Sequence, residues 1–130
     1  MILNKTKFWF NPSNTSPDYV NVCANTYTAD YPFSSTVPQT CYGHQYPKTG
    51  NAMVGIGTYI VYTVNDSINY FSEYISVKLT DTLKAGVCYY GEFYAVLADL
   101  CEYHTNRLGM YLTQNTFTTS LIPHSILRIL

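Results

Sequence analysis

The alternation of hydrophobic and polar positions is most regular between residues 72 and 99, where it predicts two β-strands joined by a tight turn. In the first strand, Ile75, Val77 and Leu79 fall on one face and polar or amphipathic residues fall on the other. This period of two is typical of a strand with one buried face.

The second strand of this predicted hairpin, residues 87–98, is apolar or aromatic on nearly both faces. Such a strand is expected inside a sandwich, where a second sheet covers it. The chain is therefore predicted to be all-β, with the 130 residues forming a single antiparallel β-sandwich domain.

Other segments fit the same architecture. Gly50 and Asn51 predict a turn, and the glycines at positions 55 and 57 predict a bulge or a close backbone approach in the strand that follows it. The further expected elements are a strand in two parts over residues 52–63, a polar loop tip over 64–69, a strand over 108–113 and a short strand over 116–122.

Residues 9–45 are predicted to be a long, aromatic-rich loop region within the domain. Pro12, Pro17, Pro32 and Pro38 interrupt the segment, and Asn, Ser and Thr lie between them. Because loops of this length in small domains often bind ligands, the segment indicates a binding function.

The C-terminal residues Ile126 to Leu130 are mostly apolar and have no polar cap. An exposed apolar end favours association. We expect it to form part of a strand whose partner lies beyond this chain or on another molecule, so a homo-oligomer through an open sheet edge is one hypothesis.

Composition narrows the classes of partner. Charged residues make up 12% of the chain, the net charge is −1, and no basic stripe is present, which argues against nucleic acid. No apolar stretch is long enough to span a bilayer, and no signal peptide is visible in the sequence. The 14 tyrosines suit strands that expose a hydroxyl to a partner.

The four cysteines, Cys23, Cys41, Cys88 and Cys101, include no CxxC pair, so a zinc or thioredoxin-type site has little support. Two disulfides in an extracytoplasmic domain would allow three connectivities. Pairing of Cys23 with Cys41 is the first choice, and buried free thiols at Cys88 and Cys101 are the alternative.

Several motifs, taken in order, carry a resemblance. They are SPDYVN at 16–21, TGNAMVGI at 49–56, the segment from EYISVKL to LAD over 73–99, and LGMYL at 108–112. This order is similar to that of a family of Bacteroidetes surface and secreted proteins whose modules resemble galactose-binding-like jelly rolls. The resemblance implies a jelly-roll fold, a secreted or cell-surface location, and roles in carbohydrate binding or adhesion.

The chain also departs from that family. It lacks the N-terminal NPSFE-like strand whose acidic residue often holds a structural calcium, so we expect no cofactor, with calcium as the alternative. The IDNIG-like segment reads TNRLG here, which replaces its acidic residue by Asn106. Relatives continue for further strands, so the domain is expected to be incomplete at both ends.

No catalytic motif is present. His44, His104 and His124 lack metal-ligand spacing, and the sequence contains no HExxH, GxSxG or glycine-rich phosphate loop. Glu73 and Glu92 lie on consecutive predicted strands, but we interpret them as solvent-face charges rather than a glycosidase pair. The chain is predicted not to be an enzyme.

Two functional hypotheses follow. The first is a non-catalytic binding module in which aromatic rings stack on a sugar and polar groups hold its hydroxyls. The second is a structural subunit of a surface appendage, filament or phage-like assembly, completed by strand pairing between subunits. Asp99 is expected to accept backbone N–H bonds in the next loop, a structural role. The candidate ligand-binding residues, all expected on loops, are Trp9, Tyr19, His44, Tyr46, Tyr103 and Asn106.

Overall fold

The computed structural model describes residues 6–24, 36–106, 108–115 and 127–129. In this part of the chain the protein is all-β: it forms short strands and no helix. The strands are β1 (Trp9–Phe10), β2 (Asp18–Asn21), β3 (Gln39–Thr40), β4 (Gly43–His44), β5 (Ala52–Gly55), β6 (Ile60–Val64), β7 (Ser67–Phe71), β8 (Ser76–Val77), β9 (Met110–Leu112) and β10 (Leu127–Ile129).

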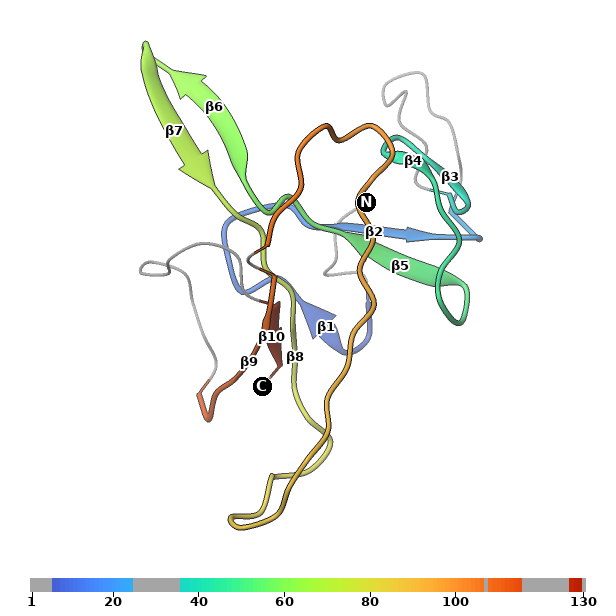
Figure 1. Cartoon of the computed structure of the whole chain (residues 1–130), viewed down its shortest axis with the longest axis vertical. Helices are drawn as coiled ribbons and strands as arrows, with labels where there is room; N and C mark the ends of the chain where they lie inside the picture. The colour runs from blue at the N-terminus through green and yellow to red at the C-terminus, as the bar shows by residue number, and fades with distance from the viewer. Residues whose placement is uncertain (1–5, 25–35, 107, 116–126, 130) are drawn as a thin grey trace.

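These strands pair two by two. The pairs β1–β8, β2–β5, β3–β4 and β6–β7 are antiparallel, and β9–β10 is parallel. The pairs β1–β8 and β9–β10 lie together near the centre of the molecule, where β10 contacts β8 (Figure 1). Within the described residues no sheet has more than two strands, so a two-layer sandwich is not assembled.

The predicted turn and the two-part strand after it are confirmed. Gly50 has a φ of 68°, which a glycine adopts without steric cost. The carbonyl of Asn51 accepts a hydrogen bond from the N–H of Val22 at 3.1 Å, which extends the β2–β5 ladder. The chain then leaves β5 and enters β6 after four residues that include Gly57. The strand predicted over 108–113 is likewise present as β9.

The long hairpin predicted over residues 72–99 is wrong in its main part. Only Ser76 and Val77 form a strand there, and every residue from 80 to 97 is exposed. The connecting turn does form: the N–H of Val87 donates to the carbonyl of Lys84 at 3.3 Å, and Gly86 has a φ of 77°. Residues 78–98, the 78–98 arm, project from the other elements around this turn, and the second half of the arm runs back beside them (Figure 1). Without a second sheet to cover its apolar face, the arm does not form a ladder.

The polar loop tip predicted over 64–69 is also wrong, because most of it belongs to a hairpin. Asn65 and Asp66 alone form the turn, with φ values of 48° and 60°. Positive φ at both central residues is what a type I′ turn requires, and this turn matches the twist of the flanking strands. Ser67 therefore pairs with Val64 and begins β7.

The region 9–45 is not one long loop in its described residues. It contains β1, β2, β3 and β4, and Pro12, Pro17 and Pro38 lie outside these strands. Two of the predicted features, residues 25–35 of this region and the strand over 116–122, lie outside the described residues.

The prediction for the C-terminal strand is wrong about its partner. Leu127–Ile129 pairs with β9 of the same chain, with Leu127 opposite Met110 and Ile129 opposite Leu112. The C-terminal strand thus pairs within the chain rather than with another molecule. A pattern of three residues does not predict a parallel pair with a distant strand.

The buried residues are few. Among the described residues, the buried hydrophobic side chains are those of Val20, Val37 and Tyr74, and Pro17 and Ser76 are fully enclosed. The hydroxyl of Ser76 has no hydrogen-bond partner, although the strand around it pairs with β1. These residues lie on β2 and β8 or in the segments that precede β2, β3 and β8.

Glu73 is part of this centre and is not the solvent-face charge that we predicted. Its side chain is buried, and one carboxylate oxygen accepts the N–H of Ser16 at 3.0 Å. The other oxygen accepts the N–H of Gly57 at 2.8 Å, and the Glu73 N–H donates to the Gly57 carbonyl at 2.8 Å. Glu92, by contrast, is exposed and accepts a bond from the hydroxyl of Tyr90 at 3.1 Å.

We expect Glu73→Gln to lower the free energy of unfolding by about 1–3 kcal/mol, because the amide keeps one acceptor oxygen and turns its NH2 group toward a backbone N–H. Chemical denaturation followed by circular dichroism measures the change. Glu92→Gln is the matched control and should shift stability by less than about 0.5 kcal/mol. Equal effects of the two substitutions would contradict the structural role of Glu73.

Candidate functional site

The β3–β4 hairpin and the residues after it lie along the end of the 78–98 arm. The His44 N–H donates to the Asp99 carboxylate at 2.7 Å, and the Leu100 N–H donates to the Tyr42 carbonyl at 3.3 Å. Farther along, the Lys48 ammonium lies 4.8 Å from the centroid of the Tyr94 ring. Residue numbers rise from Tyr42 to Lys48 in the first segment, while those of their partners fall from 100 to 94. The two segments therefore run antiparallel.

A glycine permits the closest point of this contact. Gly43 has a φ of 130°, which L side chains rarely adopt. A Cβ atom at this position would lie 2.5 Å from the Cβ of Asp99. Any larger residue would therefore displace Asp99 and remove its bond to His44.

Asp99 is a backbone acceptor, as expected, but its partner differs from the prediction. The donor is His44, 55 residues earlier in the chain, rather than a residue of the following loop. The turn after Asp99 is closed by a backbone bond from Cys101 to Ala98 at 2.9 Å. Asp99 thus connects distant segments, which no local sequence pattern indicates.

A second carboxylate lies on the other side of the β3–β4 hairpin. The Tyr42 hydroxyl donates a hydrogen bond to Asp18 of β2, and the ring of Tyr42 lies over Gly55 of β5. Burial, followed by the bond to the negatively charged Asp18, raises the pKa of the Tyr42 hydroxyl far above its ordinary value. Tyr42 therefore stays protonated and joins the hairpin to the β2–β5 pair.

Cys41 precedes Tyr42 and is half-buried. Burial raises the pKa of its thiol, and the nearby charge of Asp18 acts in the same direction, while a hydrogen bond with Tyr42 opposes the increase. All four cysteines are free in the structure, and the preferred Cys23–Cys41 pair is not formed. The expectation of buried thiols at Cys88 and Cys101 is wrong, because both are exposed.

His44 and Tyr46 form the exposed part of this junction. Their ring centroids are 5.4 Å apart and the ring planes meet at 85°, an edge-to-face contact. The Tyr46 side chain is 65% exposed. Of the candidate ligand-binding residues, these two are brought together, beside the carboxylate of Asp99.

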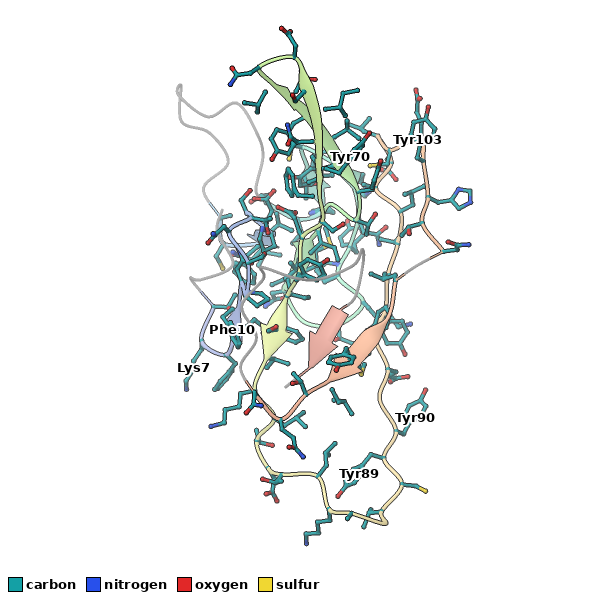
Figure 2. The ribbon with its side chains drawn as sticks, turned by 90° about the vertical axis from the view of Figure 1, so that its left-hand side faces the viewer. Lys7, Phe10, Tyr70, Tyr89, Tyr90 and Tyr103 are labelled. Carbon is teal, nitrogen blue, oxygen red and sulfur yellow. The ribbon has the colours of Figure 1, made fainter. Side chains whose placement is uncertain are left out.

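The other candidates lie elsewhere. Trp9 and Tyr19 are half-buried on β1 and β2, so together with His44 on β4 they correct the expectation that all candidates lie on loops. Tyr103 is 86% exposed, and Asn106 is exposed near it in the chain. Tyr103 lies on the opposite side of the molecule from Phe10, the neighbour of Trp9 (Figure 2). The candidates therefore do not form one binding site.

Sequence reasoning missed Asp18, Tyr42 and Gly43 as parts of this junction. Asp18 is 24 residues from its partner Tyr42, and although Asp18 belongs to the SPDYVN segment, nothing in that segment indicates a bond to Tyr42. The sequence feature that could have pointed to the junction is Gly43, because a glycine at such a position indicates a close backbone approach. It does not indicate which segment approaches.

In the described part of the chain, no group of His, Cys, Asp and Glu residues is arranged to hold a metal ion. No helix among those residues has the length and apolarity needed to cross a bilayer. Comparison with protein-family models, with curated proteins and with solved structures finds no match for this chain.

We expect Cys41 to be the slowest of the four cysteines to react with iodoacetamide at neutral pH. The thiolate is the nucleophile, and the raised pKa of Cys41 together with its burial lowers the reactive fraction. Peptide mass spectrometry after timed alkylation ranks the four thiols, with the urea-unfolded chain as control. Slow labelling of Cys23 and Cys41 together, relieved only by a reductant, would instead indicate a disulfide between them.

Proposed function

We propose that this protein is a structural subunit whose strands and apolar surfaces are completed by association with other copies. The observation that carries the proposal is the 78–98 arm, in which apolar and aromatic residues typical of a covered strand are exposed. Tyr90 is 87% exposed, and large side chains on both sides of it are exposed as well: Val87, Tyr89, Phe93, Tyr94, Val96 and Leu97.

Strand pairing is the form of association that the described strands favour. Each of the two-stranded sheets has unpaired outer edges among the described residues, and a two-stranded sheet is marginally stable by itself. The motif order of the sequence supports a two-layer jelly-roll sandwich as the completed form. An extracytoplasmic location is part of the proposal and is supported by the resemblance alone.

We expect the purified chain to associate as its concentration rises. Size-exclusion chromatography with light scattering should give masses that are multiples of 14.8 kDa at about 100 µM, the concentration range where weak interfaces are populated. Thioredoxin or another compact protein of similar mass serves as the control for column behaviour. A mass of one chain at every concentration would contradict the proposal.

A second candidate function is non-catalytic carbohydrate binding, and the His44–Tyr46 pair favours it. An exposed aromatic ring stacks on the apolar face of a sugar, and an imidazole held at 85° to that ring presents polar nitrogens beside it. The Asp99 carboxylate fixes the backbone at His44, which holds the pair in place.

If this candidate is right, a glycan array should show binding that falls at least tenfold in Tyr46→Ala, because the stacking surface is lost. Tyr90→Ala is the matched control, since Tyr90 is also an exposed tyrosine, at 87% against 65% for Tyr46, but lies on the arm. Absence of glycan binding, or equal losses in the two variants, would contradict a sugar site at this pair.

A further inference from the structure

The β6–β7 hairpin carries an apolar face that the described residues leave exposed. Its strands pair over five residues each and project from the other elements (Figure 1). Cross-strand partners share a face, so Val61 and Tyr70 lie on the same side as Thr63 and Ile68. Tyr59 extends this side by stacking on Tyr70, with ring centroids 5.3 Å apart and planes at 24°.

This side is called here the tyrosine face, formed by Tyr59, Val61, Ile68 and Tyr70. The four side chains are 59%, 52%, 62% and 52% exposed, respectively. Tyr70 and the surrounding hairpin side chains lie at one end of the molecule in Figure 2. On the opposite side of the hairpin Tyr62 packs edge-to-face against Phe71, with ring centroids 5.5 Å apart, and its large side chains are less exposed, at 44% for Tyr62 and 49% for Val64.

The tyrosine face also lacks the devices by which proteins prevent association of strands. Between residues 57 and 72, the only charged residue is Asp66, which lies in the turn. Proline and lysine, which commonly protect exposed strands, are absent from this segment. Val, Ile and Tyr are residues of high β-propensity, and they pack well against a second sheet surface.

We propose that the tyrosine face is where two copies of this chain meet, packing the same four residues against each other across a twofold axis. This inference rests on the proposed assembly function and names its interface. A second copy fits because an uncharged apolar face is complementary to itself, as a twofold contact requires. Antiparallel packing of the hairpins also places the two Asp66 turns at opposite ends, so the like charges stay apart.

The size of the face sets the expected strength. Two half-exposed tyrosines and two half-exposed aliphatic side chains offer roughly 350–400 Å² per copy, about half of what a standard interface buries on each side. The hairpin contact alone is therefore a weak dimer, and we expect it to dissociate on dilution into the low micromolar range.

Neighbouring residues on β7 allow a sharp test. Ile68→Lys places a charge on the tyrosine face, whereas Ser67→Lys places the same charge on the opposite face of the same strand, also at an exposed position. Sedimentation velocity across concentrations from about 1 µM to about 1 mM should show a dissociation constant raised at least tenfold in Ile68→Lys. Ser67→Lys should associate like the unmodified chain.

Two further variants separate loss of the contact from loss of folding. Ile68→Thr keeps a β-branched residue and should weaken association less than Ile68→Lys, in the same direction. Ile68→Glu should be weakened like Ile68→Lys, but an equimolar mixture of the Lys and Glu variants should associate more strongly than either variant alone, because the repulsion between two like charges in one dimer becomes an attraction. Only folded chains can give this recovery.

The outcomes distinguish the two proposals. If the unmodified chain is monomeric at every concentration, both the assembly function and this interface are overturned. If it associates and Ile68→Lys associates equally well, the assembly function stands and the tyrosine face is overturned as its interface. Weakening by both Ile68→Lys and Ser67→Lys, without recovery in the mixture, also overturns the face-to-face contact.

Discussion

The interaction on which the described architecture most depends is the buried carboxylate of Glu73. Its two oxygens bind the N–H of Ser16, just before β2, and the N–H of Gly57, between β5 and β6. Glu73 itself lies between β7 and β8. One side chain thus holds segments that lead into three different strand pairs, β2–β5, β6–β7 and β1–β8. Charge-assisted bonds to backbone N–H groups substitute here for the apolar contacts that a larger core would supply.

Because hydrogen bonds rather than apolar contacts hold the centre together, much of the apolar surface stays exposed to solvent. The few buried hydrophobic side chains gather near this carboxylate, and the strand pairs farther away, β6–β7 above all, do not pack into the same core. A two-stranded sheet cannot bury both of its faces alone. The exposed 78–98 arm and the tyrosine face follow from the same constraint, which is why both proposals concern association.

The junction around Asp99 shows a second way in which polar groups position the chain. Asp99 fixes His44, Gly43 allows the close approach, and Tyr42 reaches Asp18 on β2. These contacts join residues that are between 24 and 56 positions apart. They hold the edge-to-face pair of His44 and Tyr46 at the surface, where it remains the one grouping of predicted binding residues.

Local patterns predicted those parts of the fold that local forces determine. The glycine at position 50 predicted the turn that the structure has there. The residue pattern predicted the two-part strand that forms β5 and β6, and it predicted β9. The Asn65–Asp66 turn was within reach of the same reasoning, because Asn and Asp tolerate positive φ, but the polar residues around it favoured a loop instead. Of the candidate site, the sequence predicted His44, Tyr46 and the acceptor role of Asp99.

The sequence by itself determined the all-β class, the low charge and the abundance of tyrosine, because each follows from residue type and short-range periodicity. Only the tertiary structure decided that Glu73 is buried, that Leu127–Ile129 pairs with β9, and that residues 80–97 are exposed. These outcomes depend on which distant segments meet. An alternating pattern predicts that one face of a strand is buried. Which surface buries that face depends on the whole chain or on its partner.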